Sequence, residues 1–123
     1  MVARKVVLTV GATHLQNQRP SDPQPPEALA QLQALLDALT SRPPPWVLLG
    51  DLNLGPVEVV PVVEGAGLTA IVETPTFPSV TPQESIDWIA VGGADVVSTE
   101  VPDVRTSDHR PLVAVLGERP VGH

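Results

Sequence analysis

The stretch Val47-Leu48-Leu49-Gly50-Asp51-Leu52-Asn53 joins a short apolar run to two polar side chains. The run Val47–Leu49 shows no alternation with polar residues, which predicts a strand buried on both faces. Gly50 allows the backbone to leave that strand without a Cβ penalty. Asp51 and Asn53 are two residues apart, so an extended backbone would point both to the same side. The pair either places a carboxylate and an amide together at the end of a core strand or forms an ordinary Asx turn.

Composition and charge limit the class of protein that this chain can form. At 123 residues, with 42% of them hydrophobic, the sequence predicts one globular domain, residues 1–123, with a core of its own. The absence of cysteine excludes disulfides and thiolate metal sites. A net charge of −7 argues against a broad electrostatic grip on nucleic acid, but it allows hydrolysis of a phosphate ester beside a screening cation. We see no signal peptide and no apolar run of membrane-spanning length, so we expect a cytoplasmic protein.

Apolar runs on either side of the central stretch predict an α/β fold. A helix is expected over Glu27–Thr40, because its leucines recur at the spacing of one helix face. A short second helix is expected to open at Pro61 and to end at Gly65 or Gly67. Strands are expected at Val6–Val10, Ile86–Val91, Asp95–Val101 and Leu112–Leu116, most of them buried on both faces. Less regular segments are expected at the loop Gln16–Pro26, the connection or short strand Leu68–Val72 and the frayed tail Gly117–His123.

Several polar residues lie at the ends of these apolar strands or inside them. His14 follows the first strand among small residues, and a lone histidine there is more often structural than catalytic. Asp87 lies between two large apolar residues, where an unpaired carboxylate is costly, so it needs a partner, and a histidine is a natural one. Asp108 and His109 lie in the polar loop before the last strand. The chemical case for each of these residues depends on what lies beside it in the fold.

In this order, and with these apolar flanks, the polar segments resemble the endonuclease/exonuclease/phosphatase superfamily, which has the DNase I-like fold. The matching segments are Thr13-His14-Leu15, Gly50-Asp51-Leu52-Asn53, Thr76-Phe77-Pro78, Ile86-Asp87-Trp88-Ile89 and Ser107-Asp108-His109-Arg110-Pro111-Leu112. The resemblance extends from about Lys5 to Leu116, and its last two segments are the most specific. It implies part of an α/β sandwich, with mainly antiparallel or mixed sheets and flanking helices, that hydrolyses phosphate esters with Mg²⁺ or Mn²⁺.

The resemblance also implies a role for each candidate residue. It assigns catalysis to His14, Asp51, Asn53, Asp87 and His109, and metal binding to Asp108 and Asp51. Asp51 would orient or deprotonate the attacking water, or serve the leaving group, and Asn53 would hold that geometry. Asp87 would accept a hydrogen bond from His109 and orient it against the scissile phosphate. His14 would bring a second imidazole to the phosphate.

One part of the family pattern has no counterpart in this sequence. In the family, a first half supplies an asparagine and the glutamate that is the principal metal ligand. The chain therefore resembles a C-terminal portion whose N-terminal half is missing, so we expect weak binding of divalent cations by the chain alone. We also expect a homodimer, or a complex with a polypeptide that supplies the missing half.

Two alternatives remain open at this point. The chain could be a catalytically inactive remnant of this fold that serves as a binding or interaction module. It could instead be an unrelated α/β domain whose acidic strand ends bind Ca²⁺. Within the enzymatic interpretation the substrate is a nucleic acid, a lipid head group or a small phosphate ester, and the acidic charge mildly disfavours nucleic acid.

Overall fold

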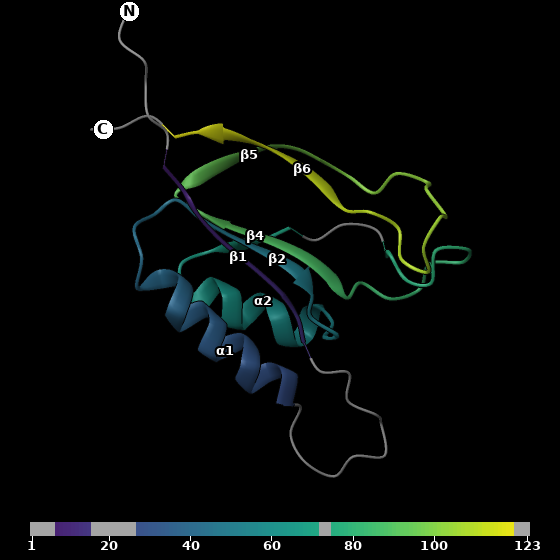
Figure 1. Ribbon diagram of the computed structural model, residues 1–123, viewed down its shortest axis with the longest axis horizontal. Coiled ribbons are helices and arrows are strands. Elements are labelled where there is room, and N and C mark those ends of the chain that lie inside the picture. Colours follow the sequence, from purple (N-terminus) through teal and green to yellow (C-terminus); the bar gives the residue numbers. More distant parts are fainter. Residues whose placement is uncertain (1–6, 16–26, 72–74, 120–123) are drawn as a thin grey trace, which may run out of the picture.

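The computed structural model describes residues 7–15, 27–71 and 75–119. Its elements are β1 (Thr9–His14), α1 (Glu27–Thr40), β2 (Trp46–Asp51), α2 (Pro56–Gly65), β3 (Thr69–Ala70), β4 (Asp87–Gly92), β5 (Ala94–Glu100) and β6 (Val113–Glu118). Figure 1 shows three layers: the two helices, a central sheet, and the β5–β6 pair over the other face of that sheet. The expected loop Gln16–Pro26 lies outside the described residues. None of the described helices is long and apolar enough to cross a membrane.

The central sheet has four strands in the order β1-β2-β4-β3. β1 is parallel to β2, whereas β4 is antiparallel to both β2 and β3. The expectation of a mixed sheet with flanking helices is therefore confirmed. This topology brings the C-terminal ends of β1 and β2 and the N-terminal end of β4 to one edge of the sheet.

β2 and β4 are buried on both faces, as their unbroken apolar runs predict. Alternate residues of each strand enter two different clusters of buried side chains. Leu48 and Trp88 pack on the helix side with the apolar face of α1, which has the predicted bounds. Val47 and Ile89 pack on the opposite side against side chains of the β5–β6 pair. Burial on both faces explains why these strands show no polar alternation.

β1 and β6 differ from the prediction of strands buried on both faces. β1 covers Thr9–His14 and does not include Val7 and Leu8 of the expected strand Val6–Val10, while Val6 lies outside the described residues. The exposure of β1, the edge strand of the central sheet, alternates along the strand. β6 also alternates in exposure, because it belongs to the separate two-stranded sheet and buries one face only. Gly117 and Glu118 belong to β6, so the predicted frayed tail is wrong for these two residues, and residues 120–123 lie outside the described part.

The second helix is longer than predicted, and it begins earlier. It starts at Pro56, after Gly55 as N-cap, and Pro61 lies inside the helix instead of opening it. Pro56 suits the first helical position because a backbone N–H there would have no partner within the helix, so proline loses no hydrogen bond by lacking one. Leu68–Val72 contains the short strand β3, which pairs with β4, while Val72 lies outside the described residues.

Candidate active site

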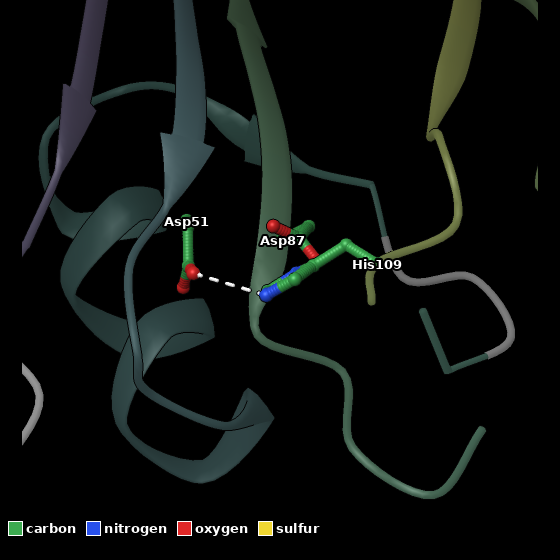
Figure 2. A group of neighbouring side chains, drawn as sticks. All are labelled: Asp51, Asp87 and His109. Carbon is green, nitrogen blue, oxygen red and sulfur yellow. Dashed lines mark hydrogen bonds and ion pairs between the residues drawn. The ribbon is translucent and has the colours of Figure 1, made fainter. Parts of the chain in front are cut away.

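Polar residues lie side by side across three neighbouring strands of the central sheet. His14, the last residue of β1, pairs in register with Asp51, the last residue of β2. Asp51 pairs with Asp87, the first residue of β4. Paired residues of neighbouring strands point to the same face, so these side chains project together on the side of the β5–β6 pair. His109 reaches the same place from the loop before β6, and Figure 2 shows its ring between the two carboxylates.

Gly50 sets the close approach of β2 to β1 next to Asp51. Its φ of +150° lies in the region that favours glycine. A Cβ at this position would lie 1.9 Å from the carbonyl oxygen of Thr13, its partner in β1. Any other residue would therefore force the two strands apart beside His14 and Asp51.

Asp51 meets two imidazoles with one of its carboxylate oxygens. Oδ2 lies 3.4 Å from Nε2 of His14 and 3.6 Å from Nε2 of His109. The other oxygen, Oδ1, accepts a hydrogen bond of 3.0 Å from the backbone N–H of Asn53, which orients the carboxylate. The side chain of Asp51 is only 15% exposed, whereas that of His14 is 75% exposed. The inner part of the site is therefore Asp51 with His109, and His14 covers it from the solvent side.

The side chain of Asn53 does not lie next to that of Asp51 but bonds to the backbone that supports the site. Its φ of +50° is left-handed, so the expectation of an extended backbone with both polar side chains on one side is wrong. The hydrogen bond from the backbone N–H of Asn53 to the side chain of Asp51 makes this strand end an Asx-type turn as well. The side-chain amide donates to the carbonyl oxygen of Leu15 at 2.7 Å. Asn53 thereby ties the end of β1, which carries His14, to the end of β2.

The hydrogen bond predicted between Asp87 and His109 is present. Oδ2 of Asp87 and Nδ1 of His109 are 2.6 Å apart. The hydroxyl of Thr76 donates to the same oxygen at 2.6 Å. The ring of Phe77 packs against the imidazole with centroids 4.7 Å apart. No chemical reason in the sequence selects Thr76 or Phe77; the only signal was the resemblance of the segment Thr76-Phe77-Pro78 to the family pattern.

The surroundings of His109 raise its pKa. Burial lowers the pKa, but the hydrogen bond to Asp87 and the negative charge of that residue raise it, and the charges of Asp51 and Asp108 add to the effect. The balance leaves the pKa of His109 above its ordinary value of 6.5. The ring is thus a stronger base than a free imidazole, and it keeps its proton to a higher pH.

Asp108 lies next to this cluster without entering its centre. Its side chain is exposed and accepts a hydrogen bond of 3.2 Å from the hydroxyl of Ser107. Its backbone carbonyl accepts a bond of 2.7 Å from the N–H of Ser79, which helps to hold the loop that carries His109. Asp108 contributes charge to the pKa of His109 from this position.

One set of described residues has the composition of a divalent-cation site. Asp51, Asp87 and His109 each offer one ligand atom, and these atoms lie within 4.8 Å of one another. Carboxylate oxygens suit Mg²⁺ and Mn²⁺, and an imidazole nitrogen also suits transition metals. The donor set fits such an ion but fills only about half of an octahedral shell. Asp51 was an expected ligand, Asp87 was not, and Asp108 is not among these three.

The fold and the site together define a class of protein. It is an α/β sandwich in which carboxylates and imidazoles meet at one edge of the central sheet, an arrangement suited to proton transfer and to cation binding. The chain belongs to the endonuclease/exonuclease/phosphatase family, whose family model matches residues 3–109. This family comprises hydrolases that act on phosphoesters and typically depend on divalent metals. The predicted resemblance is confirmed, and the alternative of an unrelated Ca²⁺-binding domain is wrong.

A solved structure shows the same fold. It is the crystal structure of a functionally unknown conserved protein from Enterococcus faecalis V583, with a TM-score of 0.73 and 22% sequence identity. The match covers 94% of this chain and 52% of the other, so the chain spans about half the length of that protein. A search of curated proteins found no match. The fold is therefore that of a partial DNase I-like sandwich, as predicted.

Proposed function

We propose that this chain carries a divalent-cation-dependent site that hydrolyses phosphate esters. The observation that carries the proposal is the arrangement around His109. Oδ2 of Asp87 accepts a hydrogen bond from Nδ1 of His109, and Nε2 of the same ring lies 3.6 Å from Oδ2 of Asp51. An ionised carboxylate can only accept, so in this arrangement Nδ1 carries the proton and Nε2 is the nitrogen that acts on substrate.

The side chains then divide the work of phosphoryl transfer. The raised pKa of His109 favours the doubly protonated ring, which can donate a hydrogen bond from Nε2 to a phosphoryl oxygen and stabilise the charge that develops there. Asp51 would orient or deprotonate the attacking water, or serve the leaving group, from its place between two imidazoles. His14 would bring a second imidazole to the phosphate from the exposed side, and Asn53 would hold the strand ends in place.

A divalent cation is the proposed cofactor. When bound, Mg²⁺ or Mn²⁺ supplies positive charge to the phosphoryl oxygens. Asp51 and Asp87 are suited to hold it, and the exposed carboxylate of Asp108 could add to the negative charge nearby. We expect weak binding by the chain alone, with a dissociation constant above about 10⁻⁴ M, because three converging ligands among the described residues fill about half of an octahedral shell. Calorimetric titration with Mg²⁺ and Mn²⁺ measures it, and micromolar binding would contradict this expectation.

The proposed substrate is a small phosphate ester or a lipid head group rather than nucleic acid. The net charge of −7 disfavours binding of a polyanion. We also infer that the chain works as a homodimer or with a polypeptide that supplies the family's other half, because it spans about half of its structural relative. Its proposed location is the cytoplasm.

The test is hydrolysis of bis-para-nitrophenyl phosphate and para-nitrophenyl phosphate by the full chain, with Mg²⁺ or Mn²⁺ and with EDTA. We expect metal-dependent release of nitrophenol, reduced at least about 100-fold in Asp51→Asn. Asp95→Asn is the matched control, since Asp95 is an exposed carboxylate in β5 that pairs with Arg119, directly after β6 and away from the site. Equal rates in wild type, Asp51→Asn and EDTA would instead favour the inactive remnant that serves as a binding module.

A further inference from the structure

Thr76 contacts the site through one oxygen of the Asp87 carboxylate. Its hydroxyl and Nδ1 of His109 each lie 2.6 Å from Oδ2 of Asp87. Only 2% of Thr76 is exposed, so substrate does not reach this residue. We propose that Thr76 is a positioning residue that fixes the Asp87 carboxylate and, through it, the ring of His109. This proposal rests on the proposed phosphoesterase function.

The Asp87 carboxylate needs such a restraint because its own torsion is soft. Rotation about the bond to the carboxylate group of an aspartate is broad rather than confined to staggered wells. A single hydrogen bond to His109 leaves the plane of the carboxylate free to rotate with the imidazole. A second donor on the same oxygen, from a different element, defines where Oδ2 lies. The direction in which Nε2 of His109 faces Asp51 then follows.

Thr76 is itself held in place on several sides. Its β-branched side chain is stiff at χ1, and its burial prevents other rotamers. Its backbone N–H donates to the carbonyl oxygen of Glu84 at 3.1 Å. Its carbonyl oxygen accepts a hydrogen bond of 2.7 Å from the N–H of Arg110, the residue that follows His109. Thr76 thus bonds both to the carboxylate that orients the imidazole and to the loop that carries it.

Neighbouring residues complete this support. Phe77 covers one face of the His109 ring, with an interplanar angle of 45°. The guanidinium of Arg110 donates to the carbonyl oxygen of Ser79 at 2.8 Å. The hydroxyl of Ser79 donates to the carbonyl oxygen of Ser107 at 2.6 Å. These contacts hold the loop, but in the described part of the chain only Thr76 and His109 are seen bonded to the Asp87 side chain.

The decisive variant is Thr76→Val, which keeps the branched shape and removes the hydroxyl. Thr76→Ser keeps the hydroxyl and serves as the rescue variant. Ser79→Ala is the matched control, because it removes another buried hydroxyl from the same loop whose partner is a backbone carbonyl. The first measurement is the ¹⁵N spectrum of the His109 ring in EDTA, at a pH where the ring is neutral. The second is kcat and KM for bis-para-nitrophenyl phosphate.

We expect wild type, Thr76→Ser and Ser79→Ala to show His109 protonated at Nδ1 alone, and Thr76→Val to show a mixture of both tautomers. We expect kcat of Thr76→Val to fall about tenfold while KM changes less than about twofold. If the chain hydrolyses no ester, the proposed function fails, yet the tautomer measurement still decides the role of Thr76. An unchanged tautomer in Thr76→Val, or the same mixture in Ser79→Ala, would overturn the proposal. If Thr76→Val does not fold, Thr76→Ala takes its place with the same expected spectra.

Discussion

At the scale of single residues, the site depends on two carboxylates that each contact a group of the scaffold and at least one histidine. Asp51 uses Oδ1 for the backbone of its own turn and Oδ2 for the two imidazoles. Asp87 uses Oδ2 for both a hydroxyl and an imidazole. Each carboxylate is thus oriented by the scaffold while it contacts a histidine. Single substitutions in these pairs are therefore expected to have specific consequences.

Replacing Asp87 with asparagine is expected to lower kcat at least about 100-fold for any phosphoester that the chain hydrolyses. The amide can donate as well as accept, so it no longer requires the proton of His109 to be at Nδ1. Steady-state kinetics in Mn²⁺ measure the effect, and Asp95→Asn provides the matched control with an exposed carboxylate. Full activity in Asp87→Asn would show that the orienting role is wrong.

The raised pKa of His109 predicts a pH-dependent stability. The folded state binds the proton more tightly than the unfolded chain, whose value is near 6.5. The stabilisation is therefore fully present below pH 6.5 and is lost as the pH rises through the folded-state pKa. Urea unfolding in EDTA across this window should show a free energy of unfolding that falls with rising pH.

The same experiment on His109→Gln is expected to give a flatter profile, since the titrating ring is gone. Asp87→Asn should also flatten it, because the hydrogen bond and charge of Asp87 raise the pKa of His109. A profile in His109→Gln that falls as steeply as in wild type would assign the pH dependence to another group.

At the scale of elements, the end of β2 determines where the site forms. The strand is buried on both faces by separate clusters, so its position in the sheet is strongly constrained. Its close approach to β1 at Gly50 and its pairing with β4 place three polar side chains in one row. The loop from Thr76 to Ser79 then brackets the loop of His109 by hydrogen bonds to its backbone. Strand register and loop contacts, rather than the loops alone, hold the site.

Gly50→Ala is expected to destabilise the chain by at least about 2 kcal/mol, because it combines backbone strain with a steric clash. The added Cβ would lie 1.9 Å from the Thr13 carbonyl oxygen. Gly65→Ala is the control, since a Cβ there meets nothing within 4 Å and Gly65 lies in the last turn of α2. That change should be neutral or stabilising, by up to about 1 kcal/mol. Equal stability of the two variants in urea unfolding would contradict the role of Gly50.

At the scale of the whole molecule, the three layers cover the central sheet unevenly. The β5–β6 pair packs over Val47, Ile89 and Val91, whereas Val10 of the edge strand β1 remains 53% exposed. The outer face of the β5–β6 pair also exposes apolar side chains, namely Val97, Val113 and Val115. Apolar side chains gathered on one part of a surface usually mark an interface. β5 and β6 therefore cover part of the sheet face that lies opposite the helices.

We expect the chain to be a homodimer, or to associate with a polypeptide that supplies the other half of the domain. Light scattering at micromolar concentration measures the mass of the chain alone. Val97→Lys and Val115→Lys should weaken the association, while Val57→Lys, on the exposed side of α2, should leave it unchanged. A mass of one chain without binding of a hydrophobic dye would show that the described fold closes its own core.

Local sequence was enough to predict the helix Glu27–Thr40, the burial of β2 and β4, and the need of Asp87 for a partner, while the family resemblance implied that this partner is His109. Helix periodicity, unbroken apolar runs and the cost of an unpaired carboxylate are all properties of neighbouring residues. Motif order was enough to predict the family, because it depends on the chain alone. The separation of β5 and β6 into a second sheet was not predicted. The apolar run Leu112–Leu116 does not by itself show whether a strand buries one face or both. The turned side chain of Asn53 and the hydroxyl of Thr76 on Asp87 could be seen only in the tertiary structure, because both depend on residues distant in sequence that strand pairing brings together.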